Sequence, residues 1–166
     1  YVFWGPHAKK VIALHNEAGV MGRNIDIYMI SSLIGFAYGR RSPLCKDCAE
    51  GESTVVNTKI FHEQLYNCKE KLELNYRMIL LLDEEYEPDE QKRIDKAFRY
   101  FGKNEADIER CEDYSRGGIE VLYEKIIGDA LRKEDYANNL FDFIDEFNYR
   151  FNKEIDISTV MKLLSK

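Results

Sequence analysis

The stretch NIDIYMISSLIGFAYGRRSP, residues 24–43, constrains the fold more than any other part of the chain. From Ile25 to Tyr38 it carries a single charged side chain, Asp26, and its apolar residues surround a helix on every side. Such a helix is stable only inside a core or an interface. It is shorter than the roughly 20 residues that cross a bilayer, and two serines and a glycine interrupt it. We therefore expect a central helix of a globular core.

Composition favours helix in the rest of the chain as well. The 166 residues include only three prolines, and long stretches are rich in Leu, Glu, Lys and Arg. The chain is long enough for one domain with its own core. No repeat and no alternating strand pattern is visible. We therefore expect residues 1–166 to form a single all-α domain, an orthogonal bundle of six or seven helices around the apolar central helix at about residues 25–38.

Capping residues, glycines and prolines set the expected helix bounds. The expected helices are one opened by Pro6 and ended by Gly19, the central helix from Asn24 to Gly39, one over 58–84, one from Pro88 to Gly102, one from Asn104 to Ile127, one over 133–151, and a short one capped by Asp156. The Asn24 side chain is expected to accept from the amide of residue 26 or 27, and Asn104 pairs with Asp107 in a similar cap.

Gly117 and Gly118 lie inside one of these expected helices. Two glycines lower helix propensity by about 2 kcal/mol together. They therefore either break the helix or allow a very close neighbour, for which the apolar central helix is one candidate. The other interpretation is that they admit a nucleic-acid backbone beside Arg116.

The charge distribution is uneven. The net charge of −6 argues against a protein whose whole surface binds nucleic acid or membrane. Residues 1–44, however, hold five basic and two acidic side chains, whereas residues 83–115 hold twelve acidic and six basic ones. The first region could contact phosphates and the second could bind a basic partner, or both could be solvated helix faces. The candidate phosphate-contacting residues are Lys9, Lys10, Arg23, Arg40, Arg41 and, less directly, Arg116.

Arg40 and Arg41 allow two interpretations. Cations after a helix C-terminus complement the helix dipole without any ligand. Two adjacent arginines can also hold phosphates, because a guanidinium pairs bidentately with phosphate oxygens. The negative end of the helix beside them favours the first interpretation.

The sharpest chemical motif is Cys45, Cys48, His62 and Cys68, which reads C-x2-C-x13-H-x5-C. These residue types could close a tetrahedral zinc site, and four protein ligands would make it structural rather than catalytic. If 58–84 is one helix, however, His62 and Cys68 point about 120° apart on it. The alternative is a simple loop pair of cysteines. No other cofactor is indicated, and four cysteines without a secretory signal favour a reducing cytoplasm.

Nothing in the chain predicts an enzyme. The histidines have no serine, cysteine or carboxylate pattern that forms a nucleophile–base pair, and RGGIE lacks the spacing and the lysine of a phosphate-binding loop. The paired carboxylates near the C-terminal end alternate with Leu and Phe, as an amphipathic helix requires.

Two segments, NIDIYMISSLIGFAYGRRSP and YSRGGIEVLYEKI, with LNYRMILLLDEE between them, resemble a group of known proteins. These are small accessory proteins of unassigned function found with bacterial restriction and DNA-modification clusters, including those linked to DNA phosphorothioation. The pattern vYxxAxxxGyxxGkR recurs among them, and Tyr28, Gly35, Phe36, Gly39 and Arg41 fall on it. The resemblance implies a phage-defence accessory protein that works in a larger assembly, and it implies no reaction.

Together these observations predict a cytoplasmic, non-enzymatic subunit of a bacterial defence or restriction system. It would bind other subunits of a complex, with duplex-DNA contact through its basic N-terminal part. A small DNA-binding transcriptional regulator is the alternative, although the central helix has no polar face to read bases. A metal-dependent hydrolase is a third, but the four-ligand set leaves no open metal position.

Overall fold

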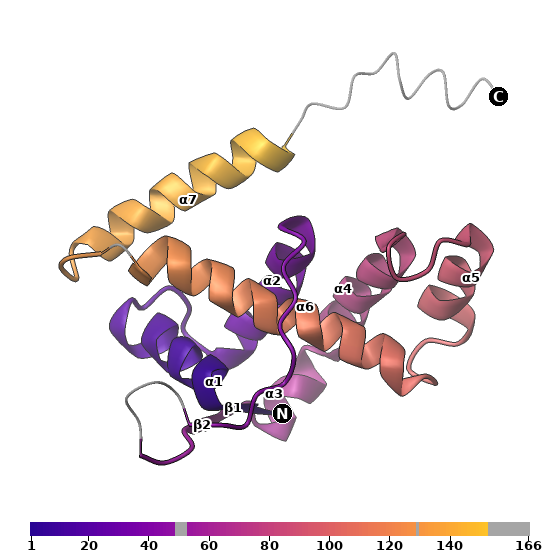
Figure 1. Ribbon diagram of the computed structural model, residues 1–166, viewed down its shortest axis with the longest axis horizontal. Helices are drawn as coiled ribbons and strands as arrows, with labels where there is room; N and C mark the ends of the chain where they lie inside the picture. The colour runs from indigo at the N-terminus through magenta and orange to yellow at the C-terminus, as the bar shows by residue number, and fades with distance from the viewer. Residues whose placement is uncertain (49–52, 129, 153–166) are drawn as a thin grey trace.

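The computed structural model describes residues 1–48, 53–128 and 130–152, and these are mostly helical (Figure 1). The elements in chain order are β1 (Val2–Trp4), α1 (Gly5–Ile12), the π-helical η1 (Ala13–Glu17), α2 (Asn24–Ala37), β2 (Asn57–Lys59), α3 (His62–Asn67), α4 (Lys69–Leu82), α5 (Glu90–Ile94), the π-helical η2 (Asp95–Arg99), α6 (Glu105–Tyr123), the π-helical η3 (Glu124–Gly128) and α7 (Asp135–Phe151). The predicted predominance of helix is confirmed.

A short antiparallel sheet is the main departure from the expected fold. Val2 of β1 pairs with Lys59 of β2, and Trp4 pairs with Asn57. Strands of three residues are too short to show an alternating sequence pattern, which is why they escaped prediction. β2 also occupies the start of the helix expected over 58–84. That helix is interrupted again at Cys68, where the backbone leaves helical geometry between α3 and α4.

The central helix α2 ends where it was predicted to end, but the residue at its N-cap differs from the prediction. Gly39 ends it with φ of +62°, as expected for a left-handed exit residue. Asn24, by contrast, does not cap the helix. Its side-chain amide donates to Thr58 Oγ1 at 3.0 Å and to the carbonyl of Lys59 at 3.1 Å, and so ties α2 to β2. The N-cap position belongs to Arg23, which makes no side-chain capping bond.

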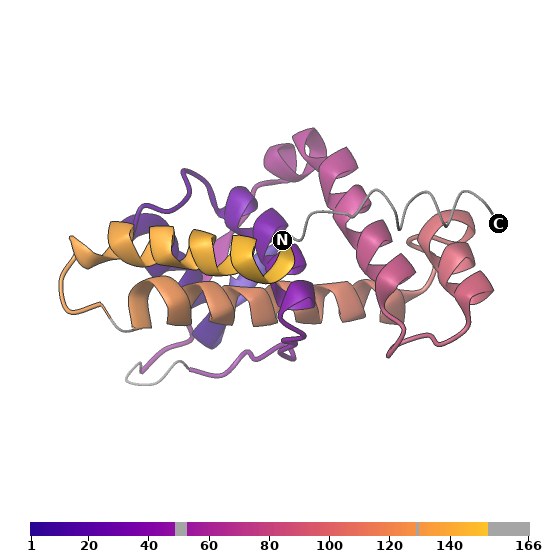
Figure 2. The same cartoon turned by 90° about the horizontal axis from the view of Figure 1, so that it is seen from above.

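α2 and α6 cross at backbone contact, and this crossing organises the core (Figure 2). A Cβ atom on Gly118 would overlap the carbonyl oxygen of Ser31, and one on Gly35 would overlap a carbonyl oxygen of α6. A Cβ on Gly117 would meet the backbone of Arg40. The glycine pair therefore permits the close helix approach that was one of its two interpretations, and α6 continues through it unbroken.

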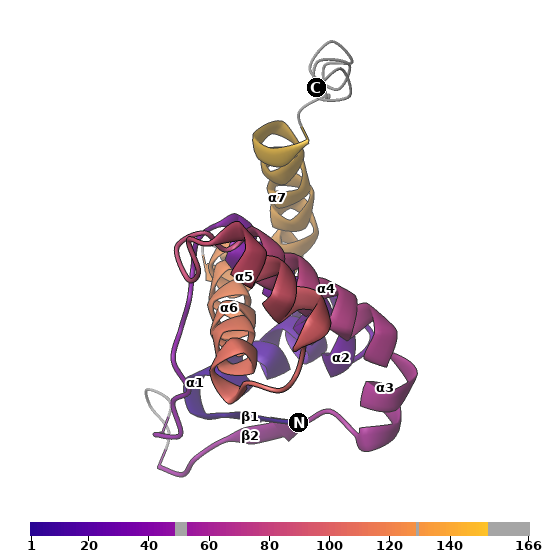
Figure 3. The ribbon, with the colours of Figure 1, turned by 90° about the vertical axis from the view of Figure 1, so that its right-hand side faces the viewer.

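The buried side chains gather around this crossing. α2, α4 and α6 supply most of the fully buried aliphatic residues, which include Ile25, Ile27, Ile79, Leu80 and Ile119. Figure 3 shows α7 at the opposite end of the molecule from the β1–β2 sheet, against one side of the other helices. Phe143 is the one residue of α7 that is buried.

Two other predicted helix ends are also present in the structure. Asn104 caps α6 by accepting from the amide of Ala106 at 3.1 Å, and its amide donates to Asp107 at 3.3 Å, as predicted. Gly102 has the left-handed φ of +74° expected of a terminating glycine. The short helix predicted after Asp156 lies outside the described residues. Within the described ranges, no helix combines the length and the apolarity that crossing a membrane requires.

Candidate functional site

Arg40 and Arg41 both pair with carboxylates of this chain. Arg40 donates from Nε to Glu120 at 3.2 Å and from Nη2 to Glu124 at 3.1 Å, which joins the end of α2 to the end of α6. Arg41 donates to Glu85 at 3.2 Å, in the loop after α4. Both guanidinium groups thus fasten the segment after α2 to its neighbours.

Most of the other predicted phosphate contacts are also engaged. Arg23 forms a bidentate pair with Asp26 at 2.9 and 2.7 Å, and Lys10 lies 4.0 Å from Glu120 and above the ring of Tyr123. Lys9 is exposed in the last turn of α1. Lys10 and Arg40 share Glu120, whereas Arg23 lies at the other end of α2 beside Asp26. Where a pair is described, each cation therefore lies beside an acid.

Arg116 is not placed to contact a phosphate. Its side chain is only 2 % exposed, and three acids of its own helix, Glu109, Glu112 and Asp113, surround its guanidinium. Its Nε also donates to the carbonyl of Ser42 at 2.9 Å, next to the glycine crossing. The sequence offered a signal for this outcome, because acids at i−3 and i−4 of a helical arginine commonly pair with it.

A buried polar cluster surrounds Glu120 where α1, α6 and the segment after α2 meet. His7 Nε2 lies 3.2 Å from Glu120 Oε1, and the Ser42 hydroxyl donates to the same oxygen at 2.8 Å. Burial alone would raise the pKa of Glu120. The hydrogen bonds from His7 and Ser42, with the charges of Lys10 and Arg40, outweigh burial and lower it to about 2.

This cluster contains a serine, a histidine and a carboxylate, but it is not a catalytic triad. Ser42 Oγ lies 3.1 Å from His7 Nε2, the same ring nitrogen that faces Glu120. In a triad the carboxylate holds one ring nitrogen and the serine meets the other. Here the hydroxyl donates directly to the carboxylate, and His7 Nδ1 is buried without a hydrogen-bond partner among the described residues. The geometry orients the loop and activates no nucleophile.

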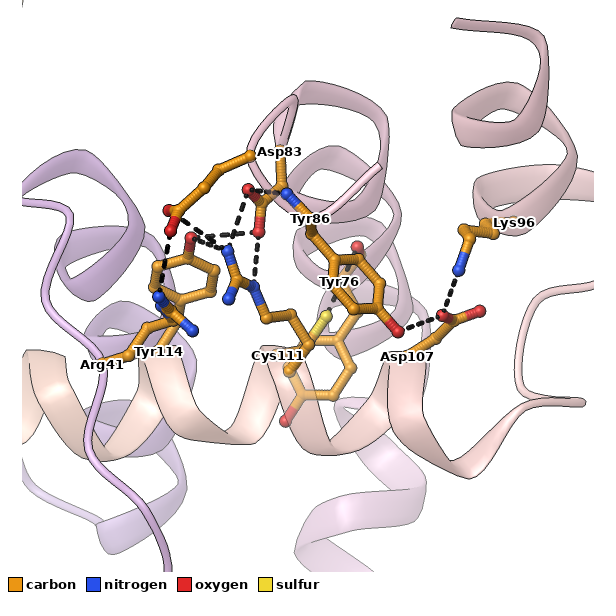
Figure 4. Close-up of polar contacts among 10 residues, drawn as sticks. Arg41, Tyr76, Asp83, Tyr86, Lys96, Asp107, Cys111 and Tyr114 are labelled. Carbon is orange, nitrogen blue, oxygen red and sulfur yellow. Dashed lines mark hydrogen bonds and ion pairs between the residues drawn. The ribbon is translucent and has the colours of Figure 1, made fainter. Parts of the chain in front are cut away.

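A second network closes the corner between α4 and α6 (Figure 4). Asp83 is 3 % exposed and accepts from Arg110 Nε at 2.7 Å, from the Tyr114 hydroxyl at 3.0 Å and from the amide of Tyr86 at 3.1 Å. Burial would raise the pKa of Asp83, but the bonds from Arg110 and Tyr114 outweigh it and leave the pKa lowered. Burial and the bond to Asp83 raise the pKa of Tyr114 to about 12.

The same network extends toward η2. Asp107 accepts from the Tyr86 hydroxyl at 2.7 Å and from Lys96 Nζ at 2.8 Å. Burial and the hydrogen bond to Asp107 raise the pKa of Tyr86 to about 12. Because Asp83 and Asp107 each accept several donors from their own chain, the arrangement positions α4, η2 and α6 relative to one another.

The predicted zinc ligands do not come together. No group of three or more His, Cys, Asp or Glu side chains in the described ranges is arranged to hold a metal ion. Cys48 is exposed in the loop before β2, whereas Cys68 is buried at the junction of α3 and α4. His62 begins α3, and β2 lies between it and the two loop cysteines. The strand and the helix break, which the spacing argument did not include, separate the four residues.

An apolar trough lies open on the surface between α4 and α7. Ile30 and Leu33 of α2 line a groove of about 270 Å³ against α7, together with Ile144 and Phe147. The same two α2 residues line a second groove of about 320 Å³ against α4, where Leu74 contributes. The two grooves therefore meet on α2, which forms the floor between α4 and α7. We call this surface the trough.

Large apolar side chains are exposed on α4 and α7, the two helices that border the trough. On α4, Leu74 lines the trough, and Leu74, Met78 and Leu82 recur every four residues and are 57 %, 38 % and 60 % exposed. On α7, Phe141 is 67 % exposed, and Ile144, which lines the trough, is 43 % exposed. The sequence analysis did not predict this exposed apolar surface. A signal for it was available, since α7 has more apolar positions than one buried stripe needs.

A separate hollow of about 460 Å³ lies between α3, α4 and the start of α6. It is lined by Leu65, Leu72, Phe101 and Ile108, and the exposed ring of Tyr66 stands at its edge. The hollow is bounded by the Lys69–Glu73 ion pair, at 3.7 Å. It presents fewer exposed apolar residues than the trough.

No protein-family model matches the chain, and neither a curated protein nor a solved structure matches it. Its functional assignment therefore depends on the residues and surfaces described above.

Proposed function

We propose that this protein is a non-enzymatic accessory subunit that acts by binding a partner protein. The observation that carries the proposal is the trough, whose walls and floor present exposed Leu, Ile, Met and Phe side chains on three helices. Contiguous exposed apolar surface of this kind is characteristic of interaction sites. The carboxylates of Glu120, Asp83 and Asp107, by contrast, all accept hydrogen bonds from groups of this chain.

The biological setting of the proposal comes from the resemblance of residues 24–43 and 114–126 to accessory proteins of restriction and DNA-modification clusters. In that setting the partner would be another subunit of a bacterial anti-phage defence system in the cytoplasm. A subunit that contributes binding needs an exposed apolar surface, and the trough supplies one.

Contact with the DNA backbone is the less well supported part of this proposal. Arg23, Arg40 and Arg41 each pair with acids of the chain, and Arg116 is buried. Binding a phosphate would first require breaking these pairs. Protein binding requires no such rearrangement, and the proposal therefore gives it priority over DNA binding.

Co-expression with the proteins encoded beside its gene tests this function. The tagged protein is expected to retain one of these neighbours through size-exclusion chromatography at micromolar concentration, with light scattering giving the mass of a defined complex. A protein that elutes alone after co-expression with each neighbour would contradict the proposal.

A further inference from the structure

α7 carries two apolar stripes, and only one of them is covered. The inner stripe consists of Tyr136, Leu140, Phe143 and Phe147, which pack against the core. The outer stripe consists of Ala137, Phe141, Ile144 and Asn148, and all four residues are exposed. We call this outer stripe the α7 seam.

The α7 seam has the spacing of a coiled-coil interface. Its members are separated by four, three and four residues, the pattern by which one helix meets another over successive turns. Asn148 occupies one of these positions, and a single polar residue in such a seam selects the register and the partner. Ile144 and Asn148 also line the groove beside α2, so the seam faces the trough.

The trough matches the shape of a helix. Its floor and its two walls are helices, and Leu74 lines the α4 wall, with exposed Met78 and Leu82 following at four-residue intervals on the same helix. A helix with side chains is about 10 Å across, and an amphipathic one binds such a groove through residues at i, i+3, i+4 and i+7. An extended strand would leave its backbone groups unpaired against these apolar walls.

Charge distinguishes the candidate occupants. Asp145 is exposed on α7 and directly follows the seam residue Ile144. Its carboxylate has no ion-pair partner within residues 1–48, 53–128 and 130–152. If the α7 of a second copy paired with the seam, it would bring the same acid to the interface, and like charges on facing helices are destabilising. A helix with lysines or arginines beside its apolar stripe would gain from this acid.

We propose that the α7 seam and the trough bind an amphipathic helix of another protein, with basic residues flanking an apolar heptad stripe. This inference rests on the proposed function and adds the chemistry of the partner. Phe141 and Ile144 supply the apolar contacts, Asn148 sets the register, and Asp145 selects the basic flank.

Two synthetic peptides provide the probe. Each has three heptads with Leu at both apolar positions, and the flanking positions carry Lys in one peptide and Glu in the other. Like charges discourage each peptide from pairing with itself. Fluorescence anisotropy of the labelled peptides then measures binding to the full chain. We expect the Lys peptide to bind at least about tenfold more tightly than the Glu peptide, with the difference reduced at high salt.

Two aromatic residues of α7 form a matched pair of variants. Phe141→Asp places a charge in the seam and should weaken binding of the Lys peptide by about tenfold or more. Tyr149→Asp makes a similar change to an aromatic residue of the same helix that is 91 % exposed and outside the seam, and it should change binding by less than about twofold. Asp145→Lys should reverse the preference between the peptides. Circular dichroism checks that each variant is folded.

The remaining outcomes overturn the proposal. Equal binding of the two peptides would contradict the preference for a basic partner. An equal loss of binding in Phe141→Asp and Tyr149→Asp would contradict the seam as the binding surface. If neither peptide binds, the proposal that an amphipathic helix occupies the trough is wrong. A dimer of the protein alone that Phe141→Asp dissociates would identify a second copy as the occupant. A neighbour that is retained by the Phe141→Asp variant in co-expression would leave the proposed function intact and show that it uses another surface.

Discussion

α6 and α7 are both long amphipathic helices, yet they are used in different ways. α6 buries ten of its 19 residues, among them an arginine, an aspartate and two glycines, and the polar ones have partners from its own chain. α7 buries one of its 17 residues and leaves the seam exposed. The difference separates the two roles. α6 packs within the chain itself, whereas the α7 seam stays exposed in the part of the chain that the structure describes.

The largest expected effect on stability comes from disrupting the backbone contact between α6 and α2. Gly118→Ala would place a methyl group against the carbonyl oxygen of Ser31, where neither helix backbone can move aside. We expect the free energy of unfolding to fall by about 4 kcal/mol, the upper range for overpacking. Chemical denaturation measures it. Gly22→Ala is the control, because a Cβ there meets nothing, and it should change stability by less than about 1 kcal/mol. Equal effects of the two variants would contradict the importance of the crossing.

The next effect comes from the network at the end of α4. Asp83→Ala removes the carboxylate that Arg110 and Tyr114 share, and it leaves the nearly buried guanidinium of Arg110 with only the more exposed Glu85, at 3.4 Å, as an acidic partner. The free energy of unfolding should fall by about 3 kcal/mol. Glu84→Ala, next in the chain and on the surface, should change it by less than about 0.5 kcal/mol. A small effect of Asp83→Ala in urea denaturation would show that the network is not needed to hold α4 against α6.

A smaller effect concerns acid stability and Glu120. Its pKa is about 2 in the folded chain against an ordinary 4.5, so the ionised form favours folding. This contribution is complete above the ordinary pKa and is lost as the pH falls from about 4.5 toward 2. After allowing for solvent screening we expect it to be about 1–2 kcal/mol. Glu120→Gln should therefore be less stable at pH 7 and show a flatter loss of stability toward pH 2. A Tm series across pH that is parallel in the two proteins would contradict this assignment.

The smallest expected effect is on DNA binding. Since Arg40 and Arg41 already pair with Glu120, Glu124 and Glu85, the double variant Arg40→Ala/Arg41→Ala should change duplex-DNA affinity by less than about twofold. Fluorescence anisotropy over a salt series measures it. If affinity instead falls steeply with salt, and the double variant flattens that slope by about two phosphate contacts, the arginines contact DNA.

Features that depend on neighbouring residues were predictable from the sequence, whereas features that depend on distant residues were not. Gly39, Gly102 and Asn104 were predicted because their roles depend on a few neighbouring residues. Gly117 and Gly118 were predicted as a site of close approach because glycine inside a helix has few other uses. These features locate the helix ends and the crossing.

Residues whose roles depend on distant partners were not predictable in the same way. Asn24 resembled a helix cap until β2, more than 30 residues away, provided better acceptors. Cys68 was separated from the other predicted zinc ligands by a helix break that no proline or glycine marks. The seam was missed because covered and uncovered apolar stripes of α7 look alike in sequence, and only the packing of α2 and η3 distinguishes them.

The glycine crossing also defines how distant relatives of this chain could be recognised. Surface residues, loop lengths and even the acidic balance can change freely without altering how α2 and α6 meet. Gly35 on one helix and the Gly117–Gly118 pair on the other cannot, because even a Cβ atom there overlaps the facing backbone. A glycine in a nearly uncharged helix, followed about 80 residues later by G-G in an acidic one, is therefore a signature that should persist after overall similarity has disappeared.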